Sequence, residues 1–279
     1  MISYPHAKIN IGLSITEKRP DGFHSIETVF YPVSLYDTLI IEPACNEANE
    51  KINFVCEGIE LPDAPQNNLC CKAYNLLDVD FDLPPTNIRL FKNIPVGAGF
   101  GGGSSDGAYT LKALNDLYKL QISDEKLANY AGLLGSDCTF FLQKTPAFGT
   151  GKGDILKPLS LSLTGYYILI VKPPVFISTA AAYSAVVPQK TPYHLPELLK
   201  TPINEWRRTI FNDFEESIFK KYPETGIVKE RLYSEGAVYA SLSGSGAGVY
   251  GIFKDNPCEI AKIFHSYFTF NQYFTKNTV

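Results

Sequence analysis

The chain has 279 residues, enough to bury a large hydrophobic core and to form two domains in close contact. Hydrophobic residues make up 45% of it and charged residues 19%, the composition of a compact globular protein. With 25 basic against 29 acidic side chains the net charge is −4, and no block of Lys or Arg occurs, so nucleic acid and anionic membranes are not expected as partners.

Cysteine usage and the N-terminal residues favour the cytoplasm. The six cysteines have no framework spacing, so we expect reduced thiols at Cys45, Cys56, Cys70, Cys71, Cys138 and Cys258. No C-x-x-C pair and no histidine pair at i, i+4 occurs, which argues against zinc. The first residues lack a signal-peptide pattern, and no run of eighteen apolar residues is present. We therefore expect a cytoplasmic protein that neither spans a membrane nor leaves the cell.

The first third of the chain is expected to be mainly extended. Residues 6–16 and 25–43 alternate apolar and polar side chains as strands do, and Asp21-Gly22 between them is a turn signal. The further elements expected before residue 95 are a strand over residues 51–59, a helix over 68–77 and a strand over 87–91.

A glycine-rich segment follows and carries the strongest functional signal. Its residues are Pro95, Val96, Gly97, Ala98, Gly99, Phe100, Gly101, Gly102, Gly103, Ser104 and Ser105. Glycine leaves backbone N–H groups accessible, and such groups leading into a helix form a cradle for phosphate. Ser104 and Ser105 suit the N-cap of the next helix. A flexible linker is the alternative interpretation, but linkers rarely join a strand to a well-patterned helix.

Two common phosphate motifs do not fit this segment. A Walker A loop ends in Gly-Lys-Ser/Thr, whereas this segment ends in Gly103-Ser104-Ser105. The dinucleotide pattern G-x-G-x-x-G fits Gly97, Gly99 and Gly102 only weakly, because that pattern belongs directly after the first strand.

The rest of the chain alternates helices and strands, and the whole is typical of an α+β fold. Ser123 is expected to cap a helix that Gly135 ends, and residues 149–154 form a turn that we take as the domain boundary. The domains are therefore expected to be residues 1–153 and 154–279. The later expected elements are a strand over 166–172, mainly helices over 204–233, and strands over 237–242 and 249–253.

Several polar residues stand where they need a partner. Lys8 lies in an apolar strand and needs an anion, unless the strand is an edge that faces water. Asp137 follows a helix end among apolar residues and needs a cation or a hydrogen-bonding task, unless it is only a turn residue. Phe23 and His24 could stack on a flat ring and bind its edge, although a histidine beside a turn is often only structural. Residues 243–248 are a second glycine run, or simply a tight hairpin.

In their order along the chain, these segments resemble the three motifs of the GHMP kinases, which include galactokinase, homoserine kinase and mevalonate kinase. More narrowly, Ala7-Lys8-Ile9-Asn10 with Arg19-x-Asp21-Gly22-Phe23-His24 is similar to the branch that phosphorylates the 2-hydroxyl of a cytidine diphosphate-linked methylerythritol in isoprenoid biosynthesis. The resemblance runs from residue 4 to about residue 255 and is weakest over 186–235.

The resemblance implies a fold and a set of site residues. The fold would be a ribosomal S5 domain 2-like N-terminal domain and a ferredoxin-like C-terminal domain. Lys8 and Asp137 would be the catalytic pair, with Asn10 lining the same site. Residues 95–105 would bind the phosphates of ATP, and Ser105 would contact Mg²⁺. Phe23, His24 and Tyr183 would bind the cytosine of the small-molecule substrate.

The sequence departs from the family pattern without losing a catalytic group. Phe23 stands where Tyr is usual, Phe100 where Leu is common and Gly107 where Ala is common. Cys138-Thr139 replaces the usual Val/Ile-Pro after Asp137, which leaves the presentation of that carboxylate open.

Three other readings compete with this one. The nearest is a GHMP kinase for another substrate such as homoserine or mevalonate, which would offer no flat base to Phe23 and His24. A non-catalytic RNA-binding module on the S5-like fold is disfavoured by the net charge, and a dehydrogenase fits worst because of the position of the glycine segment. The sequence leaves a monomer and a homodimer equally open.

Overall fold

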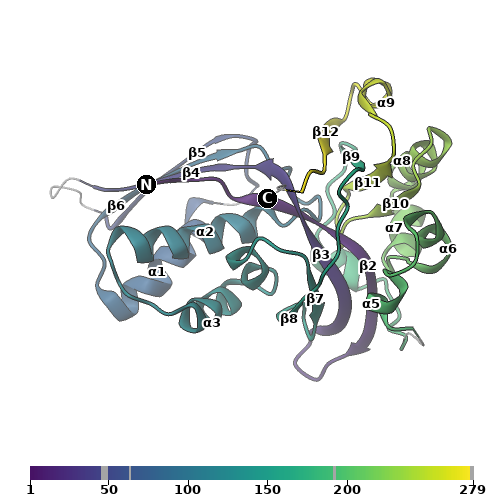
Figure 1. Ribbon diagram of the computed structural model, residues 1–279. Helices are drawn as coiled ribbons and strands as arrows, with labels where there is room; N and C mark the ends of the chain where they lie inside the picture. Colours follow the sequence, from purple (N-terminus) through teal and green to yellow (C-terminus); the bar gives the residue numbers. More distant parts are fainter. Residues whose placement is uncertain (45–49, 63, 191–192, 277–279) are drawn as a thin grey trace. The chain divides into compact units, whose positions relative to one another are not determined.

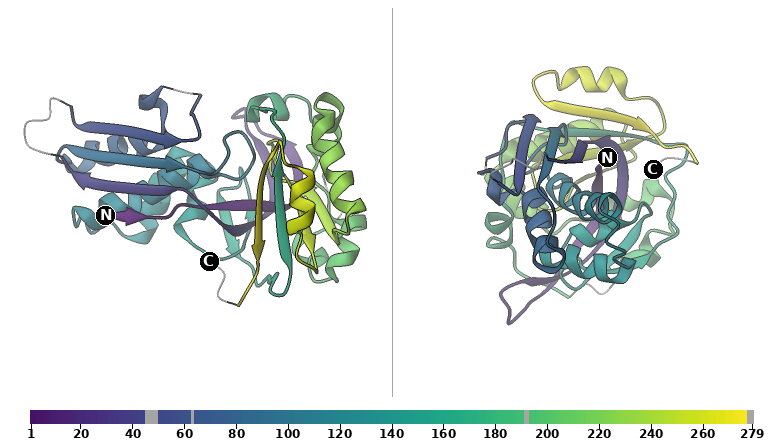
Figure 2. Two further views of the ribbon diagram at one scale, coloured as in Figure 1. Left: turned by 90° about the horizontal axis from the view of Figure 1, so that it is seen from above. Right: turned by 90° about the vertical axis from the view of Figure 1, so that its left-hand side faces the viewer.

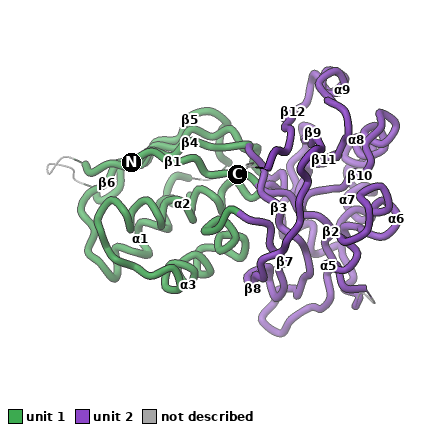
Figure 3. Tube along the Cα trace, in the orientation of Figure 1, with its two compact units in different colours: residues 1–7, 35–96, 101–144 green, residues 8–34, 97–100, 145–279 purple. Residues whose placement is uncertain are grey.

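The computed structural model describes residues 1–44, 50–62, 64–190 and 193–276 (Figure 1). The chain divides into two compact units, each built from several segments (Figure 3). Unit 1 consists of Met1–Ala7, Leu35–Val96 and Gly101–Lys144, and unit 2 of Lys8–Ser34, Gly97–Phe100 and Thr145–Val279. Unit 2 takes segments from both sides of residue 153, so these units do not test the expected division into domains. The domains of residues 1–153 and 154–279 stay a prediction.

Unit 1 is a four-stranded sheet with helices on one face (Figures 1 and 2). The strand order is β1 (Ile2–Ser3), β4 (Thr38–Pro43), β6 (Thr86–Lys92) and β5 (Ile52–Gly58), and only the β5–β6 pair is parallel. The helices are α1 (Leu69–Phe81), α2 (Gly102–Leu117) and α3 (Asp124–Leu134), followed by the 3₁₀ helix η2 (Cys138–Leu142). Parallel strands need a crossover, and α1 supplies it between β5 and β6.

Local sequence explains where two of these helices begin. Asn68 accepts the N–H of Cys70 at 2.8 Å and starts α1, and Ser123 accepts the N–H of Lys126 at 3.3 Å and starts α3, as expected. The side chains of α2 that face its neighbours, including Leu111 and Leu114, are fully buried.

The start of α2 differs from the expectation. The helix begins at Gly102 and its N-cap is Gly101, so Ser104 and Ser105 lie inside the first turn and do not cap it. Gly101 has a φ of 72°, a left-handed conformation that side-chain-bearing residues seldom adopt. The backbone N–H groups without intrahelical partners therefore belong to the glycine segment itself.

Unit 2 contains most of two further four-stranded sheets. One has the order β2 (His6–Lys18), β3 (His24–Tyr36), β7 (Ala147–Thr150) and β8 (Ile155–Pro158). The other, antiparallel throughout, has the order β10 (Tyr239–Leu242), β11 (Val249–Phe253), β9 (Tyr167–Lys172) and β12 (Phe268–Tyr273). The helices of unit 2 are α4 (Thr179–Tyr183), α5 (Leu195–Leu198), α6 (Trp206–Thr209), α7 (Glu215–Lys221), α8 (Pro223–Ser234) and α9 (Cys258–Ile263).

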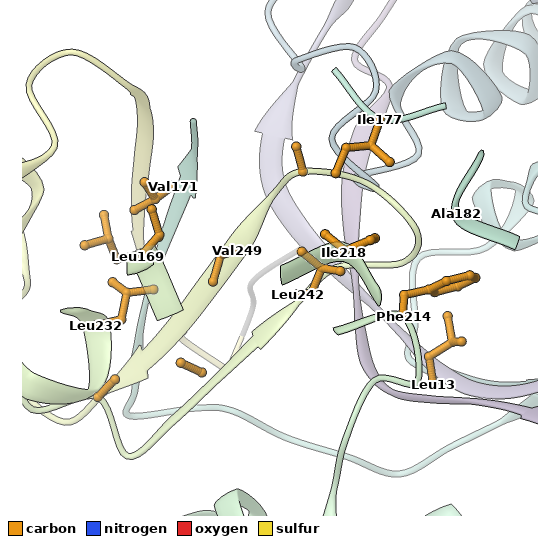
Figure 4. Close-up of a cluster of buried hydrophobic side chains, with 14 of the residues drawn as sticks. Leu13, Leu169, Val171, Ile177, Ala182, Phe214, Ile218, Leu232, Leu242 and Val249 are labelled. Carbon is orange, nitrogen blue, oxygen red and sulfur yellow. The ribbon is translucent and has the colours of Figure 1, made fainter. Parts of the chain in front are cut away.

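The core of unit 2 joins β2 to the β9–β12 sheet and its helices (Figure 4). The side chains of Leu13 in β2, Phe214 at the N-cap of α7, Ile218 in α7, and Leu242 and Val249 in the sheet are all at most 3% exposed. Burying each such side chain contributes about 1.5–3 kcal/mol, so this cluster holds the strand that carries Lys8 against the later part of the chain.

The α+β class is confirmed, and most expected elements lie within a few residues of their predicted bounds. Residues 25–43 form two strands, β3 and β4, because the chain passes to the other unit there. Residues 204–233 contain three short helices and a 3₁₀ turn at Ile203–Glu205. Strands β7 and β8 on either side of the 149–154 turn, and β12 near the C-terminus, were not predicted from the sequence.

None of the helices in the described ranges has the length and apolar character that crossing a lipid bilayer requires. The described cysteines are all free thiols, as expected, and Cys45 lies outside the described residues.

Candidate active site

The first half of the glycine segment interlocks with the second glycine run in unit 2. The hairpin alternative for residues 243–248 is correct as a description, since this run joins β10 to β11, but the turn also holds the glycine segment. The N–H of Ala247 donates to the carbonyl of Gly97 at 3.2 Å, and that of Gly248 to Ala98 at 3.0 Å. The Ser243 hydroxyl donates to the carbonyl of Gly99 at 2.9 Å. The loop is therefore an ordered element, and the linker alternative is wrong.

Backbones approach so closely here that only glycine fits. A Cβ on Gly99 would lie 1.8 Å from the carbonyl oxygen of Ser243, and Gly99 has a φ of 78°. A Cβ on Gly246 would lie 2.2 Å from the amide nitrogen of Gly99. The two glycine runs thus form one interlocked backbone structure.

Lys8 and Asn10 lie beside this structure and contact each other. The Lys8 side chain is buried and does not face water, although β2 is the edge strand of its sheet. Its ammonium donates to Oδ1 of Asn10 at 2.5 Å and lies 5.3 Å from the ring centre of Phe30. The Asn10 amide group donates to the Thr28 hydroxyl at 2.9 Å, and its backbone N–H donates to the Ser243 hydroxyl at 3.3 Å. These bonds fix both side chains relative to the interlocked loops.

Asp137 belongs to unit 1, where it lies between α3 and η2 next to the second half of the glycine segment. The neighbouring Cys138 is fully buried and its thiol is hydrogen-bonded with Ser104, while burial raises the pKa of that thiol to about 12. η2 packs against α2, which begins in the glycine segment. At Cys138, where the family usually has Val or Ile, a neutral buried thiol therefore ties the start of η2 to the first turn of α2. The pairing of Asp137 with Lys8 of unit 2 stays a prediction.

His6 supports the same region and was missed from the sequence. Its buried imidazole lies 5.2 Å from the ring of Phe141 and 6.1 Å from that of Phe140, both in η2. Burial lowers its pKa, so the ring packs in its neutral form.

Ser105 fits the expected magnesium contact by one observation. It is fully buried in the first turn of α2, and its hydroxyl oxygen has no hydrogen-bond partner in the described part of the chain. Mg²⁺ prefers oxygen ligands and commonly takes few from the protein and the rest from water and substrate phosphates. The described residues contain no group of three or more His, Cys, Asp or Glu side chains that could hold a metal ion.

The predicted base-binding residues gather in unit 2. His24 and Tyr183 stack with ring centres 5.0 Å apart, and Tyr183 also makes a T-shaped contact with Phe214, with ring centres 4.8 Å apart. Phe23 is 53% exposed, and the Lys152 ammonium lies 4.8 Å from its ring centre. A base that stacks on the His24-facing side of Tyr183 must therefore displace the imidazole.

Asn212 holds the second glycine run and was also missed. Its amide nitrogen donates to the carbonyls of Leu242 at 3.0 Å and Gly244 at 2.8 Å, on either side of Ser243. It lies in the part of the chain where the family resemblance is weakest. The signal available was the polar Asn212-Asp213 pair at the start of an expected helical region.

A buried cluster of two carboxylates and one ammonium group flanks the glycine segment in unit 1. Lys92 of β6 donates to Asp37 and, at 2.8 Å, to Asp106 of α2, and all three side chains are at most 2% exposed. Burial raises the pKa of Asp106 to about 8; Lys92 opposes this shift and Asp37 adds to it. Burial lowers the pKa of Lys92, but the two carboxylates outweigh burial and raise it.

The cluster predicts a pH dependence of stability. Between the ordinary Asp pKa of 3.8 and about 8, folded Asp106 keeps a proton that the unfolded chain releases. The free energy of unfolding should therefore fall with rising pH in this window, by up to about 1.4 kcal/mol per unit, and level off above it. Asp106→Asn should remove this component, because its amide does not titrate. Urea unfolding of both proteins at pH 5, 6.5 and 8 measures it. If the free energies of unfolding of the wild type and Asp106→Asn differ by the same amount at every pH, the assignment is contradicted. The Cys56 and Cys70 thiols also lie near the cluster, but their pKa values are raised and lie above this pH window.

Comparison with known proteins places the chain in a family. The model of the GHMP kinases N terminal domain matches residues 68–144, and that of the GHMP kinases C terminal domain matches residues 195–268. A 4-diphosphocytidyl-2-C-methyl-D-erythritol kinase from Bacteroides thetaiotaomicron is 52% identical over 254 residues, 91% of this chain and 92% of the relative. The chain belongs to the GHMP kinases.

Two further matches agree with the assignment of this chain to the GHMP kinases. A 4-diphosphocytidyl-2-C-methyl-D-erythritol kinase from Bacteroides fragilis is 49% identical over 253 residues, 91% of this chain and 92% of the relative. The crystal structure of a 4-(cytidine 5′-diphospho)-2C-methyl-D-erythritol kinase superposes with a TM-score of 0.83 at 31% identity and covers 97% of this chain and 98% of that one. The expected GHMP kinase fold is confirmed, and the binding-module and dehydrogenase readings are set aside.

Proposed function

We propose that this GHMP kinase transfers the γ-phosphoryl group of ATP to the 2-hydroxyl of 4-diphosphocytidyl-2-C-methyl-D-erythritol, in the methylerythritol phosphate route to isoprenoids. The observation that carries the proposal is the 52% identity to a relative named as a kinase of this compound. Phe23, His24 and Tyr183 support it, because they offer rings and a hydrogen-bonding edge to a cytosine base.

Asp137 and Lys8 are proposed as the catalytic pair. An aspartate carboxylate is too weak a base to ionise an alcohol beforehand. Phosphoryl transfer passes through a loose transition state, so Asp137 needs only to orient the hydroxyl and accept its proton late. Lys8, oriented by Asn10, offsets the negative charge that grows on the transferred oxygens.

The glycine segment, residues 95–105, is proposed to bind the ATP phosphates. Its support is the backbone of Gly97–Phe100 interlocked with the 243–248 turn, together with the free N–H groups at the start of α2. Ser105 would hold Mg²⁺ through its hydroxyl oxygen, with the remaining ligands from phosphate and water. When bound, Mg²⁺ neutralises charge on the phosphates.

The cellular setting follows from the same reasoning. We place the enzyme in the cytoplasm as a monomer or homodimer that acts on a small molecule and has no nucleic-acid partner. The net charge of −4 and the free thiols of the described residues support this placement.

A coupled ADP-release assay with Mg·ATP tests the proposal, offering the cytidyl substrate beside mevalonate, homoserine and galactose. Turnover with the cytidyl substrate alone is the expected result. Turnover with one of the others would keep the phosphate loop and discard the cytosine site. ATP binding without turnover of any of them would overturn the proposed reaction.

Phe23→Ala is expected to raise the KM for the cytidyl substrate. Stacking a base on an aromatic ring is worth about 1–3 kcal/mol, which corresponds to a KM about 5- to 150-fold higher with kcat little changed. Phe23→Tyr is the matched control, because it keeps the ring and restores the residue that is usual in the family. Steady-state kinetics at saturating ATP measures both variants, and an unchanged KM in Phe23→Ala would remove Phe23 from the site.

A further inference from the structure

We propose that the buried cluster of Asp37, Lys92 and Asp106 positions the phosphate loop, by fixing the chain at both ends of residues 95–105 so that the loop is preorganised for the nucleotide. The inference rests on the nucleotide-binding role proposed above and assigns a task to three side chains around that segment.

The cluster holds the entry to the loop through Asp37. One oxygen of this carboxylate accepts the backbone N–H groups of Asn93 at 2.6 Å and Ile94 at 2.8 Å, the two residues that precede Pro95. The other oxygen accepts from Lys92. Asp37 is itself held, because its N–H donates to the carbonyl of Pro5 at 2.9 Å. The direction in which the chain enters the loop is therefore set by hydrogen bonds to one carboxylate.

The ammonium group of Lys92 also holds the chain where it leaves the loop and enters α2. Lys92 reaches Asp106 in α2 at 2.8 Å. It also packs against the first helical residue, since a Cβ on Gly102 would lie 2.7 Å from the Lys92 nitrogen. The N-terminal turn of α2, whose free N–H groups face the proposed phosphates, is thus tied to the group that fixes the entry.

Stability alone does not account for the cluster. Well-packed apolar side chains commonly stabilise a protein as much as a buried ion pair or more, because charges lose their hydration on burial. The packing of polar groups is also incomplete, since one oxygen of Asp106 has no hydrogen-bond partner within the described residues. What the polar groups provide here is direction, since their hydrogen bonds hold Asn93 and Ile94 just before the loop and Asp106 just after it. The second glycine run has a similar support, where buried Glu215 accepts the N–H of Leu242 at 2.9 Å.

Asp106→Ala tests this role. We expect the Kd for adenylyl imidodiphosphate, measured by calorimetry well below the Tm, to rise about tenfold, because preorganisation is lost. The KM for ATP should rise with it, while the KM for the cytidyl substrate stays the same. Asp106→Asn keeps an oxygen acceptor for Lys92 and should stay within about threefold of the wild type.

Leu127→Ala is the control for general loss of stability, because Leu127 is a buried side chain of α3 in the same unit. It should lower the Tm without changing the Kd. If Asp106→Ala fails to fold, Asp37→Asn takes its place, since its amide NH2 group would meet a donor in either orientation, Lys92 on one side or the backbone N–H groups of Asn93 and Ile94 on the other. A Kd unchanged in the cluster variant, or weakened equally in Leu127→Ala, would overturn the inference. If the wild type shows no turnover but the Kd for adenylyl imidodiphosphate still changes in the variants as expected, only the proposed reaction is overturned.

Discussion

Asp137→Ala is expected to reduce kcat by about 10²- to 10⁴-fold, the contribution typical of a positioned proton acceptor. The variant should bind nucleotide like the wild type, because we propose that backbone groups of the glycine segment, and not this carboxylate, hold the phosphates. Single-turnover kinetics with saturating cytidyl substrate, alongside calorimetry with adenylyl imidodiphosphate, separates the two effects.

The control for this substitution is Asp124→Ala, which removes an exposed carboxylate from the first turn of α3 in the same unit. It should leave kcat within about twofold, because surface carboxylates away from a site contribute little. Near-normal turnover in Asp137→Ala would remove Asp137 from the catalytic pair. Such a result would leave the phosphate loop and the family placement untouched.

Gly99→Ala should have the second largest effect, and it should act on nucleotide binding. The added Cβ would lie 1.8 Å from the Ser243 carbonyl oxygen, and the residue would have to keep a φ of 78°. Both demands push the loop away from the 243–248 turn. A displacement of about 1 Å at such a site costs on the order of 10²-fold in rate, so kcat/KM for ATP should fall by that order.

Gly103→Ala gives a matched comparison within the same segment. No atom lies within 4 Å of a Cβ built there, and its φ is not in the left-handed range. This variant should lose much less of its kcat/KM than Gly99→Ala, since its Cβ meets no protein atom and Ala is also a better helix former than Gly. Equal losses in Gly99→Ala and Gly103→Ala would show that the interlocked backbones are not what the nucleotide requires.

The sequence predicts the parts of this molecule that depend on local chemistry. Glycine spacing identifies the loop, and Ser123 and Gly135 define one helix, because caps and turns depend on neighbouring residues. Lys8 and Asn10 are two residues apart on one strand, so their contact follows from the alternation of side chains.

Long-range contacts explain what the sequence leaves out. Asn212 is polar in a region expected to be helical, and only its bonds to Leu242 and Gly244 reveal its task. Asp37 and Lys92 are 55 residues apart, and nothing in either local pattern indicates that they meet. The cap of α2 was placed wrongly for a related reason: residue preferences favour serine, but the left-handed Gly101 begins the helix earlier.

The interlocked glycine runs also have a consequence for the order of folding. Ser243 and the Gly99 whose carbonyl it binds are separated by 144 residues. Contacts of such sequence separation form late, because the intervening chain must be ordered first. A growing chain therefore completes these interlocked backbones only after β10 and β11 have left the ribosome. The N-terminal part contains the whole glycine segment but lacks the partner that holds it until residues 243–248 have been made.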